Sequence, residues 1–205
     1  LPGPAATFAI LFGGFADSWT PVWAANPINR YTTLIATDGV RILSGFDPPA
    51  GNPTGTGETA AQRVVRILNH ASWPDDLRDI QAGGVAMQAT DHAQPAWTEL
   101  LLTADSDLGI VWLAPDGRLS YRPGEAVRAA LSQPPVAAFG CEGWDIITAA
   151  RVDFNALTVR NLVTGHNGTG SPITRADEGS AARYRYRSYK RTDLAMRDRA
   201  DLGLG

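Results

Sequence analysis

The hydrophobic positions of residues 58–122 predict a helix, a strand, a second helix and a tight hairpin, in that order. In the first helix, apolar residues recur at a spacing of three and four, which places these residues on one face: Val64, Ile67, Leu68 and Ala71. The same spacing leaves Gln62, Arg63 and Arg66 on the solvent side. Pro74 ends this helix, because proline cannot continue the helical hydrogen bonds.

The second helix is expected to begin at Pro95, whose missing N–H is not needed in a first helical turn. One side of this helix carries the apolar positions Trp97, Leu100, Leu101, Ala104 and Leu108. Gly109 is the expected C-terminal cap, because glycine adopts the left-handed conformation that often ends a helix.

A tight hairpin is predicted directly after the second helix. Its strands are Ile110–Leu113 and Leu119–Arg122, and its turn contains Pro115, Asp116 and Gly117. Proline presets φ, aspartate bonds its own backbone, and glycine accepts positive φ. Both helices need an apolar surface to cover, and the hairpin provides one. We therefore expect these residues to pack together: Val64, Ile67, Leu68, Trp97, Leu100, Leu101, Ile110 and Trp112.

Alternating apolar residues predict β-strands at both ends of the chain. Residues 7–43 are expected to be mostly strand, with the positions Phe8, Ile10, Phe12, Tyr31, Thr33 and Ile35 on strand faces. A short helix is expected over 125–131. Strands are then predicted over 146–154, 156–163 and 183–191, with a turn at 165–170 after the second.

The predicted fold class is α+β, mostly β, with strands from both ends of the chain forming a barrel-like structure. Residues 1–45 and 146–205 would form one or two β-barrel-like domains. Residues 58–125 would be an inserted helix–strand–helix–hairpin domain, and residues 126–145 a connector. Residues 45–57, rich in glycine, proline and threonine, are expected to be a loop or a domain junction.

Several short segments, in this order, resemble the tail-hub or tail-associated minor tail proteins of long-tailed bacteriophages, a baseplate hub-like family. The segments are LFGGFADSW at 11–19, YTTLIATD at 31–38, GETA at 57–60, IL at 67–68, WP at 73–74, LG at 108–109 and PDGRL at 115–119. Together they span most of the chain, but they consist of structural residues and contain no catalytic signature. One departure is Gly13-Gly14, where the family often has an arginine.

This resemblance implies a structural component of the virion at the tail tip, joining the tail tube to the parts that contact the host. The implied partners are tail tube, distal tail, tape measure and receptor-binding proteins. Proteins of this family consist of small β-barrels joined by mixed domains, and they form a trimeric ring. The resemblance therefore implies a homotrimer.

Composition agrees with a structural protein. The 205 residues carry a formal net charge of -3, and the sequence pI is about 5.6. An acidic balance argues against general binding of nucleic acid or an acidic membrane surface. Cys141 is the only cysteine, which excludes an internal disulfide and zinc sites built on paired cysteines. No apolar run approaches the roughly 20 residues that span a bilayer.

Candidate catalytic chemistry is sparse, and we predict no catalytic residue, metal or cofactor. Asp105 and Asp107 would be a carboxylate pair for a metal, but solvated side chains or turn acceptors are the better interpretation at a helix end. No serine or cysteine near a histidine stands in a nucleophile context. The remaining single candidates are His70, His92, His166, Cys141 and the formal glycosylation acceptor Asn167, which we interpret as a turn residue.

The one suggestive charged segment alternates arginine and tyrosine over 183–191. In a strand, Arg183, Arg185, Arg187 and Arg191 would share one face, with Tyr184, Tyr186 and Lys190 on the other. Single-stranded nucleic acid could bind such a pattern. The acidic pI favours a second interpretation, in which the tyrosines pack inward and the arginines face a neighbouring subunit or a central channel.

A second class of function stays open, namely a tail-associated carbohydrate-binding module or cell-wall hydrolase. A binding module should expose aromatic side chains, and the candidates are Trp19, Trp23 and Trp144, although such tryptophans are more often core or interface anchors. An enzyme should show converging acids, or a nucleophile with its base, and the sequence offers no such set.

Overall fold

The computed structural model describes residues 10–23, 31–48, 55, 57–134, 158–168 and 171–197. The predicted strand over 146–154, Phe8, Cys141 and Trp144 lie outside these residues. The helices are α1 (Gly39–Ser44), α2 (Ala60–His70), α3 (Ala96–Asp107), α4 (Gly124–Leu131) and α5 (Glu178–Tyr184), with a 3-10 helix at Asp75–Leu77. The strands are β1 (Phe15–Val22), β2 (Tyr31–Thr37), β3 (Arg78–Ile80), β4 (Ile110–Leu113), β5 (Leu119–Arg122), β6 (Leu162–Gly165), β7 (Ile173–Ala176) and β8 (Ser188–Arg191).

A central unit, residues 57–134, confirms the predicted helix–strand–helix–hairpin order. Helix α2 begins with a capping box, in which Gln62 N donates to the Thr59 hydroxyl and Thr59 N donates to the Gln62 side chain. The β4–β5 hairpin has the predicted strands, and Gly117 takes φ +85 in its turn. Strand β3 pairs in parallel with β5, which gives a three-stranded sheet in the order β3-β5-β4.

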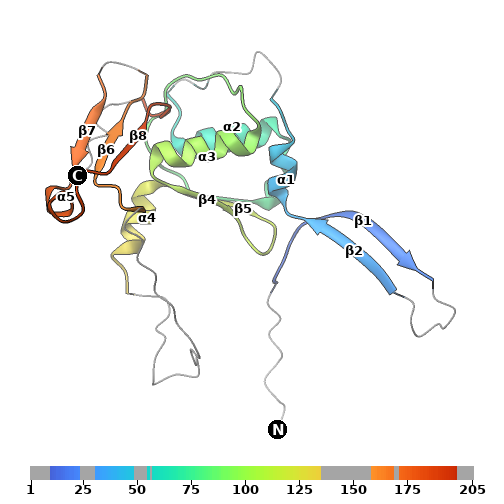
Figure 1. The fold of residues 1–205 in the computed structure, drawn as a ribbon. Coiled ribbons are helices and arrows are strands. Elements are labelled where there is room, and N and C mark those ends of the chain that lie inside the picture. Colours follow the sequence, from blue (N-terminus) through green and yellow to red (C-terminus); the bar gives the residue numbers. More distant parts are fainter. Residues whose placement is uncertain are drawn as a thin grey trace, which may run out of the picture.

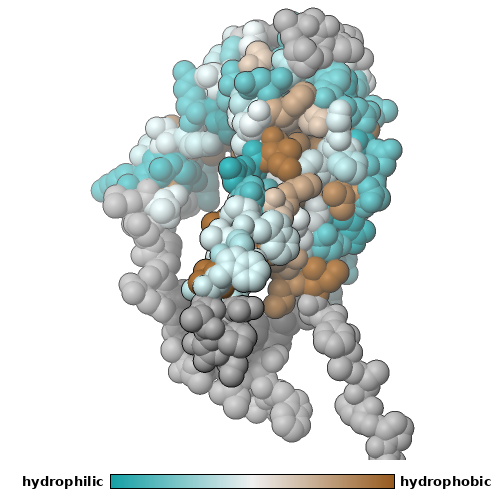
Figure 2. Space-filling model, turned by 90° about the vertical axis from the view of Figure 1, so that its right-hand side faces the viewer, coloured by the Kyte–Doolittle hydropathy of each residue, from teal (hydrophilic) through white to brown (hydrophobic). Residues whose placement is uncertain are grey.

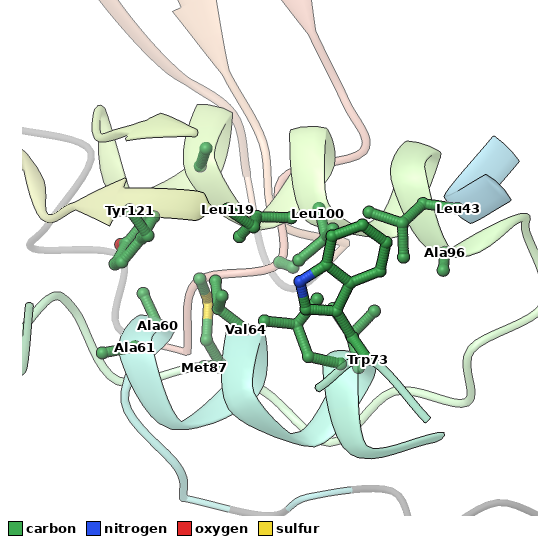
Figure 3. Close-up of a cluster of buried hydrophobic side chains, with 14 residues drawn as sticks. Leu43, Ala60, Ala61, Val64, Trp73, Met87, Ala96, Leu100, Leu119 and Tyr121 are labelled. Carbon is green, nitrogen blue, oxygen red and sulfur yellow. The ribbon is translucent and has the colours of Figure 1, made fainter. Parts of the chain in front are cut away.

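The hydrophobic core lies between α2, α3 and this sheet (Figure 3). Val64, Ile67, Leu68 and Leu100 are buried as predicted, and Trp97 packs at the edge of the core. Leu119 and Tyr121 of β5 close the cluster from the sheet side. Burial of each such side chain contributes on the order of 1.5–3 kcal/mol to folding.

Three predicted core positions are wrong. Leu101 is 41% exposed, and Ile110 and Trp112 of β4 are exposed as well. The buried stripe of α3 runs instead through Ala96, Leu100, Thr103, Ala104 and Asp107. Thr103 and Asp107 are polar but lie on this buried stripe. A prediction based on apolar residues alone therefore placed the buried face of the helix too far toward Leu101 and Leu108.

The N-terminal part contains strands, and β2 holds the predicted strand positions Tyr31, Thr33 and Ile35, whereas the first strand begins later than predicted. Ile10 and Phe12 precede β1, which begins at Phe15. Residues 39–44, expected as the end of a strand, form α1 because the Asp38 side chain accepts a bond from Val40 N at 3.2 Å and starts a helix.

A C-terminal unit, residues 158–168 and 171–197, contains the sheet β7-β6-β8, in which β6 pairs antiparallel with β7 and parallel with β8. Residues 194–197 join this unit to the central one. Ala195 N donates to Ser106 Oγ at 2.8 Å, Gln88 N donates to Ala195 O at 2.9 Å, and Arg197 N donates to Ala86 O at 2.7 Å.

Figure 1 shows the β1–β2 hairpin projecting from one side of the central unit and the C-terminal unit on the opposite side. The fold class α+β is confirmed, with comparable amounts of helix and strand rather than mostly strand. Among the described residues the β1–β2 pair and the C-terminal sheet share no strand, and no closed barrel is formed. The barrel stays a prediction.

Candidate assembly surfaces

The β1–β2 hairpin, hereafter the arm, exposes large apolar side chains on both faces. Trp19 pairs with Leu34 on one face, and Tyr31 and Ile35 lie on the other. Trp19 is 66% exposed and Tyr31 is 62% exposed. Figure 2 looks onto the side of the molecule that carries the arm, and brown hydrophobic residues lie at this surface. A two-stranded hairpin with both faces in water is only marginally stable by itself. These apolar faces are therefore suited to packing against a partner protein.

The root of the arm is fixed to the central unit. The rings of Phe15 and Trp73 meet edge to face at 5.9 Å between centroids. A bulge between Ala16 and Ser18 turns Asp17 toward Arg41 of α1, and the two side chains form an ion pair. These contacts hold the base of the arm while its outer part projects.

Gly13 lies just before the arm, against the turn of the β4–β5 hairpin. A Cβ at Gly13 would lie 2.5 Å from the Asp116 carbonyl carbon and from Gly117 N. No side chain fits at that distance without a backbone shift. Glycine at this position therefore permits a close contact between the arm root and the turn.

A groove lies at the opposite side, between the end of α3 and one face of the C-terminal sheet. Its volume is about 370 Å³. Apolar side chains line it: Leu108, Val163, Ile173, Tyr189, Leu194 and Met196. Leu108, which the sequence places on the apolar side of the second helix, takes a left-handed conformation with φ +55 and is exposed at this groove.

Arg191, one of the four predicted interface residues, lies at the rim of the groove. Its Nη1 donates to Asp105 Oδ2 at 2.7 Å, and its Nε donates to Asp193 Oδ1 at 2.8 Å. The two carboxylates raise the pKa of Arg191, Asp193 most strongly, and Arg191 in turn lowers the pKa of Asp193. Arg191 thus joins α3 to the C-terminal sheet within one chain.

The other three predicted interface arginines do not share a strand face with Arg191, because the segment is not a single strand. Arg183 lies in the last turn of α5, where its guanidinium stacks on Tyr184 at 5.2 Å. Arg185 follows the helix with φ +64, and Arg187 precedes β8. Asp177 caps α5 by accepting from Ser180 N at 2.9 Å, which favours helix over the predicted strand.

The inward packing predicted for the tyrosines is wrong for Tyr186. This side chain is 59% exposed, and its hydroxyl donates to Glu178 Oε2 at 2.7 Å. Tyr184 is half-buried. Alternating arginine and tyrosine therefore do not mark two faces of a strand here.

The interpretation of Asp107 as a solvated side chain is also wrong. Asp107 is buried at the end of α3 and accepts hydrogen bonds from Val85 N at 2.7 Å, Tyr121 Oη at 2.5 Å and Gly124 N at 2.9 Å. Burial, and then the Asp107 carboxylate, raise the pKa of Tyr121. Asp105 is exposed, as expected.

Arg63, predicted on the solvent side, is buried. Its Nε donates to Glu58 Oε1 at 2.5 Å, and its Nη2 donates to Gln88 O. Arg66 donates to the same carboxylate at 2.6 and 2.9 Å. Burial alone would raise the pKa of Glu58, but the bonds from Arg66 and Arg63 lower it overall. This network ties the start of α2 to the segment after β3.

His70 and His92, distant in sequence, come together behind α2, with their rings at 6.0 Å between centroids. His92 Nδ1 lies 3.4 Å from Glu99 Oε2, and Glu99 also accepts from Ala93 N and Gln94 N. Burial, then the neighbouring His92 ring and Arg66, lower the pKa of His70. Within the described parts of the chain, no three His, Cys, Asp or Glu side chains are grouped as metal ligands would be.

Asn167, the formal glycosylation acceptor, is buried. Its side-chain nitrogen donates to Met196 O at 3.1 Å and to Arg197 O at 3.4 Å. The amide therefore holds the turn before Gly168 against the C-terminal segment, which agrees with its interpretation as a turn residue.

No protein-family model matches the chain, and no curated protein matches it by sequence. Solved structures do match it in fold, and two of them are tail proteins. The tail protein from Neisseria meningitidis MC58 superposes with a TM-score of 0.60 at 18% identity, covering 93% of this chain and 56% of that one. The 43 kDa tail protein of prophage MuSo2 from Shewanella oneidensis has a TM-score of 0.53 at 14% identity, covering 89% of this chain and 51% of that one.

These similarities concern the fold, because the identities are low. The chain spans about half the length of each solved structure. The resemblance to phage tail proteins, inferred above from short sequence segments, therefore agrees with an independent similarity of fold over nearly the whole chain.

Proposed function

We propose that this chain is a structural component of a bacteriophage or phage-like tail. The observation that supports the proposal most directly is the match to the Neisseria tail protein over 93% of the chain. Within the tail, we assign it to the tail tip as a hub-type minor tail protein. This finer assignment is supported by the order of the sequence segments that resemble that family.

The surfaces of the described residues suit a role in assembly. The arm exposes apolar side chains on both faces, and the groove at the opposite side is lined with apolar side chains. Apolar patches of this kind on a folded protein mark contacts with other proteins. The partners we propose are tail tube, distal tail, tape measure and receptor-binding proteins, together with further copies of the chain in a homotrimer.

We also propose that the chain works without catalysis, cofactor or metal, and that specific nucleic-acid binding is not its role. None of the described helices has the length and apolar character needed to cross a membrane. The proposal places the chain in the virion, where its work is mechanical and depends on subunit interfaces.

The test is to localise the natural protein in purified particles. Gold-labelled antibody against the chain should mark the tail tip, and deletion of its coding sequence should give particles with absent or defective tails. Label on capsids, or normal infectious tails after deletion, would contradict the proposal.

A second candidate, a carbohydrate-binding module on the tail, is favoured by the outer end of the arm. Trp23 and Tyr31 are exposed there and line a hollow of about 250 Å³ with Val22 and Pro21. Aromatic rings provide flat apolar surfaces on which sugar rings can stack. Retention of the protein by purified host cell wall, lost in a Trp23→Ala variant, would support this candidate over a purely structural role.

A further inference from the structure

His70 of α2 and His92, which precedes α3, each bury one ring nitrogen that has no hydrogen-bond partner among the described residues. These atoms are His70 Nδ1 and His92 Nε2. The other nitrogen of His92 lies 3.4 Å from Glu99 Oε2, and a neutral His92 that donates there carries only a lone pair at Nε2. A neutral His70 protonated at Nε2 likewise carries only a lone pair at Nδ1. The packing therefore suits two neutral rings.

Phe46 and Pro48, which follow α1, cover the two rings. Together with Ile67 of α2 and Ala96 of α3, they line a space beside the rings that is too small to hold a water molecule. Ala96 N donates to Phe46 O at 3.0 Å, which fastens this segment to the start of α3. A protonated His70 would carry a donor at Nδ1 that meets neither water nor an acceptor among the described residues, and a buried donor of this kind is costly.

The charges around the two rings balance only while both rings are neutral. The charged groups of the surrounding elements are Glu58, Arg63, Arg66 and Glu99, with Asp47 and Asp91 exposed on the covering segments. The four inner groups are two carboxylates and two guanidiniums. After burial itself, the neighbouring His92 ring and then Arg66 lower the pKa of His70, whereas Glu58 acts in the opposite sense and more weakly. A proton on His70 therefore adds an uncompensated positive charge at this place.

The segment that covers the histidines continues directly into α1, which holds the root of the arm. Gly45 alone separates Phe46 from α1, and Gly45 N closes the helix by donating to Arg41 O at 3.1 Å. On the other side of the same helix, the Arg41 side chain forms its ion pair with Asp17 of the arm. A shift of residues 46–48 is therefore transmitted to the helix that holds the arm.

We propose that His70 and His92 form a proton-sensitive latch, in which the neutral rings hold residues 46–48 against α2 and α3, and a proton on His70 releases this segment together with α1. The β3-β5-β4 sheet stays folded in the released state. Release of α1 loosens the root of the arm, so the orientation of the arm depends on pH. The inference goes beyond the proposed function and does not depend on it, because all of these groups lie within one chain.

Amide hydrogen exchange of the full natural polypeptide, resolved by NMR at pH 7.5 and 5.0, tests the latch. Protection factors are compared, because they remove the direct effect of pH on the exchange chemistry. The informative amides are Ala96, which bonds to Phe46 O, and Gly45, which closes α1. If opening exposes His70 at a pKa of about 6.5, their protection should fall by about ten- to thirtyfold at the lower pH. At both pH values the amides of β5 should stay at least about a hundredfold better protected, because the opening is local.

Two variants identify the group that takes up the proton. His70→Gln keeps a polar side chain that does not titrate in this range, so the protection of Ala96 should differ by less than about threefold between the two pH values. His166→Gln is the matched control, because His166 lies in the C-terminal unit, and it should retain the pH dependence of the natural protein.

Spin labels report the arm itself. Leu34 on the arm and Leu101 on α3 are both exposed, and labels attached at these positions, with Cys141 replaced by serine, give a distance across the root. The distribution of this distance should be broader at pH 5.0 than at pH 7.5. It should stay narrow at both pH values when His70→Gln is added.

Several results would overturn the latch. These are protection of Ala96 that does not fall with pH in the natural protein, an unchanged fall in His70→Gln, equal exchange of Ala96 and β5, and a label distance that ignores pH. Should His70→Gln loosen the segment already at pH 7.5, the His70 ring is titrated by NMR in the natural protein instead. The midpoint of that titration should coincide with the loss of Ala96 protection, and two separate midpoints would reject the role of His70.

Discussion

At the scale of single residues, buried polar side chains organise the interior of the central unit. Asp107 connects the end of α3 to β5, to α4 and to the segment at Val85. Arg63 connects the start of α2 to Glu58 and to the backbone carbonyl of Gln88. The sequence predicted Arg63 on the solvent side and Asp107 as a solvated side chain or a turn acceptor, because charged residues are seldom fully buried unless paired, and the pairing partners of both are not evident from the sequence.

Replacing Tyr121 with phenylalanine tests this role of Asp107. The change keeps the ring in the core but removes the hydroxyl that donates to Asp107 Oδ2 at 2.5 Å. We expect a loss of about 1–3 kcal/mol in the free energy of unfolding, because a buried carboxylate oxygen loses a donor. Urea denaturation measures the loss, and an unchanged midpoint would mean that Asp107 is satisfied without Tyr121.

Leu100 and Leu101 form a matched pair that tests the position of the buried face of α3. Leu100 is fully buried, so Leu100→Ala should lower the free energy of unfolding by about 2–5 kcal/mol. Leu101 is exposed, so Leu101→Ala should change it by no more than about 0.5 kcal/mol. Thermal unfolding of both variants checks this, and equal losses would show that the helix is rotated relative to the structure.

The lowered pKa of His70 predicts a dependence of stability on pH. The folded state disfavours the protonated imidazole, so the stabilisation is fully present above the unfolded pKa of about 6.5. It is lost as the pH falls below that value and through the folded pKa. A His70→Gln variant should therefore lose less stability than the natural protein between pH 6.5 and 5. Urea denaturation at a series of pH values measures this. If the free energy of unfolding falls equally with pH in both proteins, His70 is not responsible for the loss.

At the scale of elements, patterns between residues close in the sequence predicted the elements that such local interactions stabilise. Helix α2 and the β4–β5 hairpin follow from local spacing, a capping box and a turn containing Gly117. The C-terminal unit was not predictable in the same way. Its parallel pairing of β6 with β8 joins residues far apart in sequence, and the cap at Asp177 makes a helix where the arginine–tyrosine alternation indicated a strand.

The arm should be the least protected element of an isolated chain. Its strands bury little apolar surface, whereas β5 is buried between β3 and β4. We expect amides of β1 and β2 to exchange with deuterium much faster than those of β5 in the monomer, and more slowly after assembly. Equal protection of β1 and β5 in a monomeric sample would contradict this.

At the scale of the whole molecule, the assembly surfaces were only partly predictable. Trp19 was recognised as a candidate for an exposed aromatic residue, and it is exposed. The groove was missed, because its lining comes from Leu108 and from residues more than fifty positions later, which only the tertiary structure brings together. Arg191 stays a predicted interface residue; within one chain it lies at the rim of the groove and forms ion pairs with Asp105 and Asp193.

Residues 158–197 contain eight basic and three acidic residues, which leads to a prediction for the remaining interface candidates, Arg183, Arg185 and Arg187. Changing all three to glutamate would make residues 158–197 acidic and should weaken self-association strongly, while leaving the monomer folded, because these side chains contribute little to the core. Glutamine at the same positions removes the charge without reversing it, so this control should weaken association less, and the difference should shrink at high salt. Ultracentrifugation at increasing ionic strength measures both variants. If the glutamate variant associates normally but loses binding to single-stranded DNA, the nucleic-acid interpretation of these arginines is correct instead.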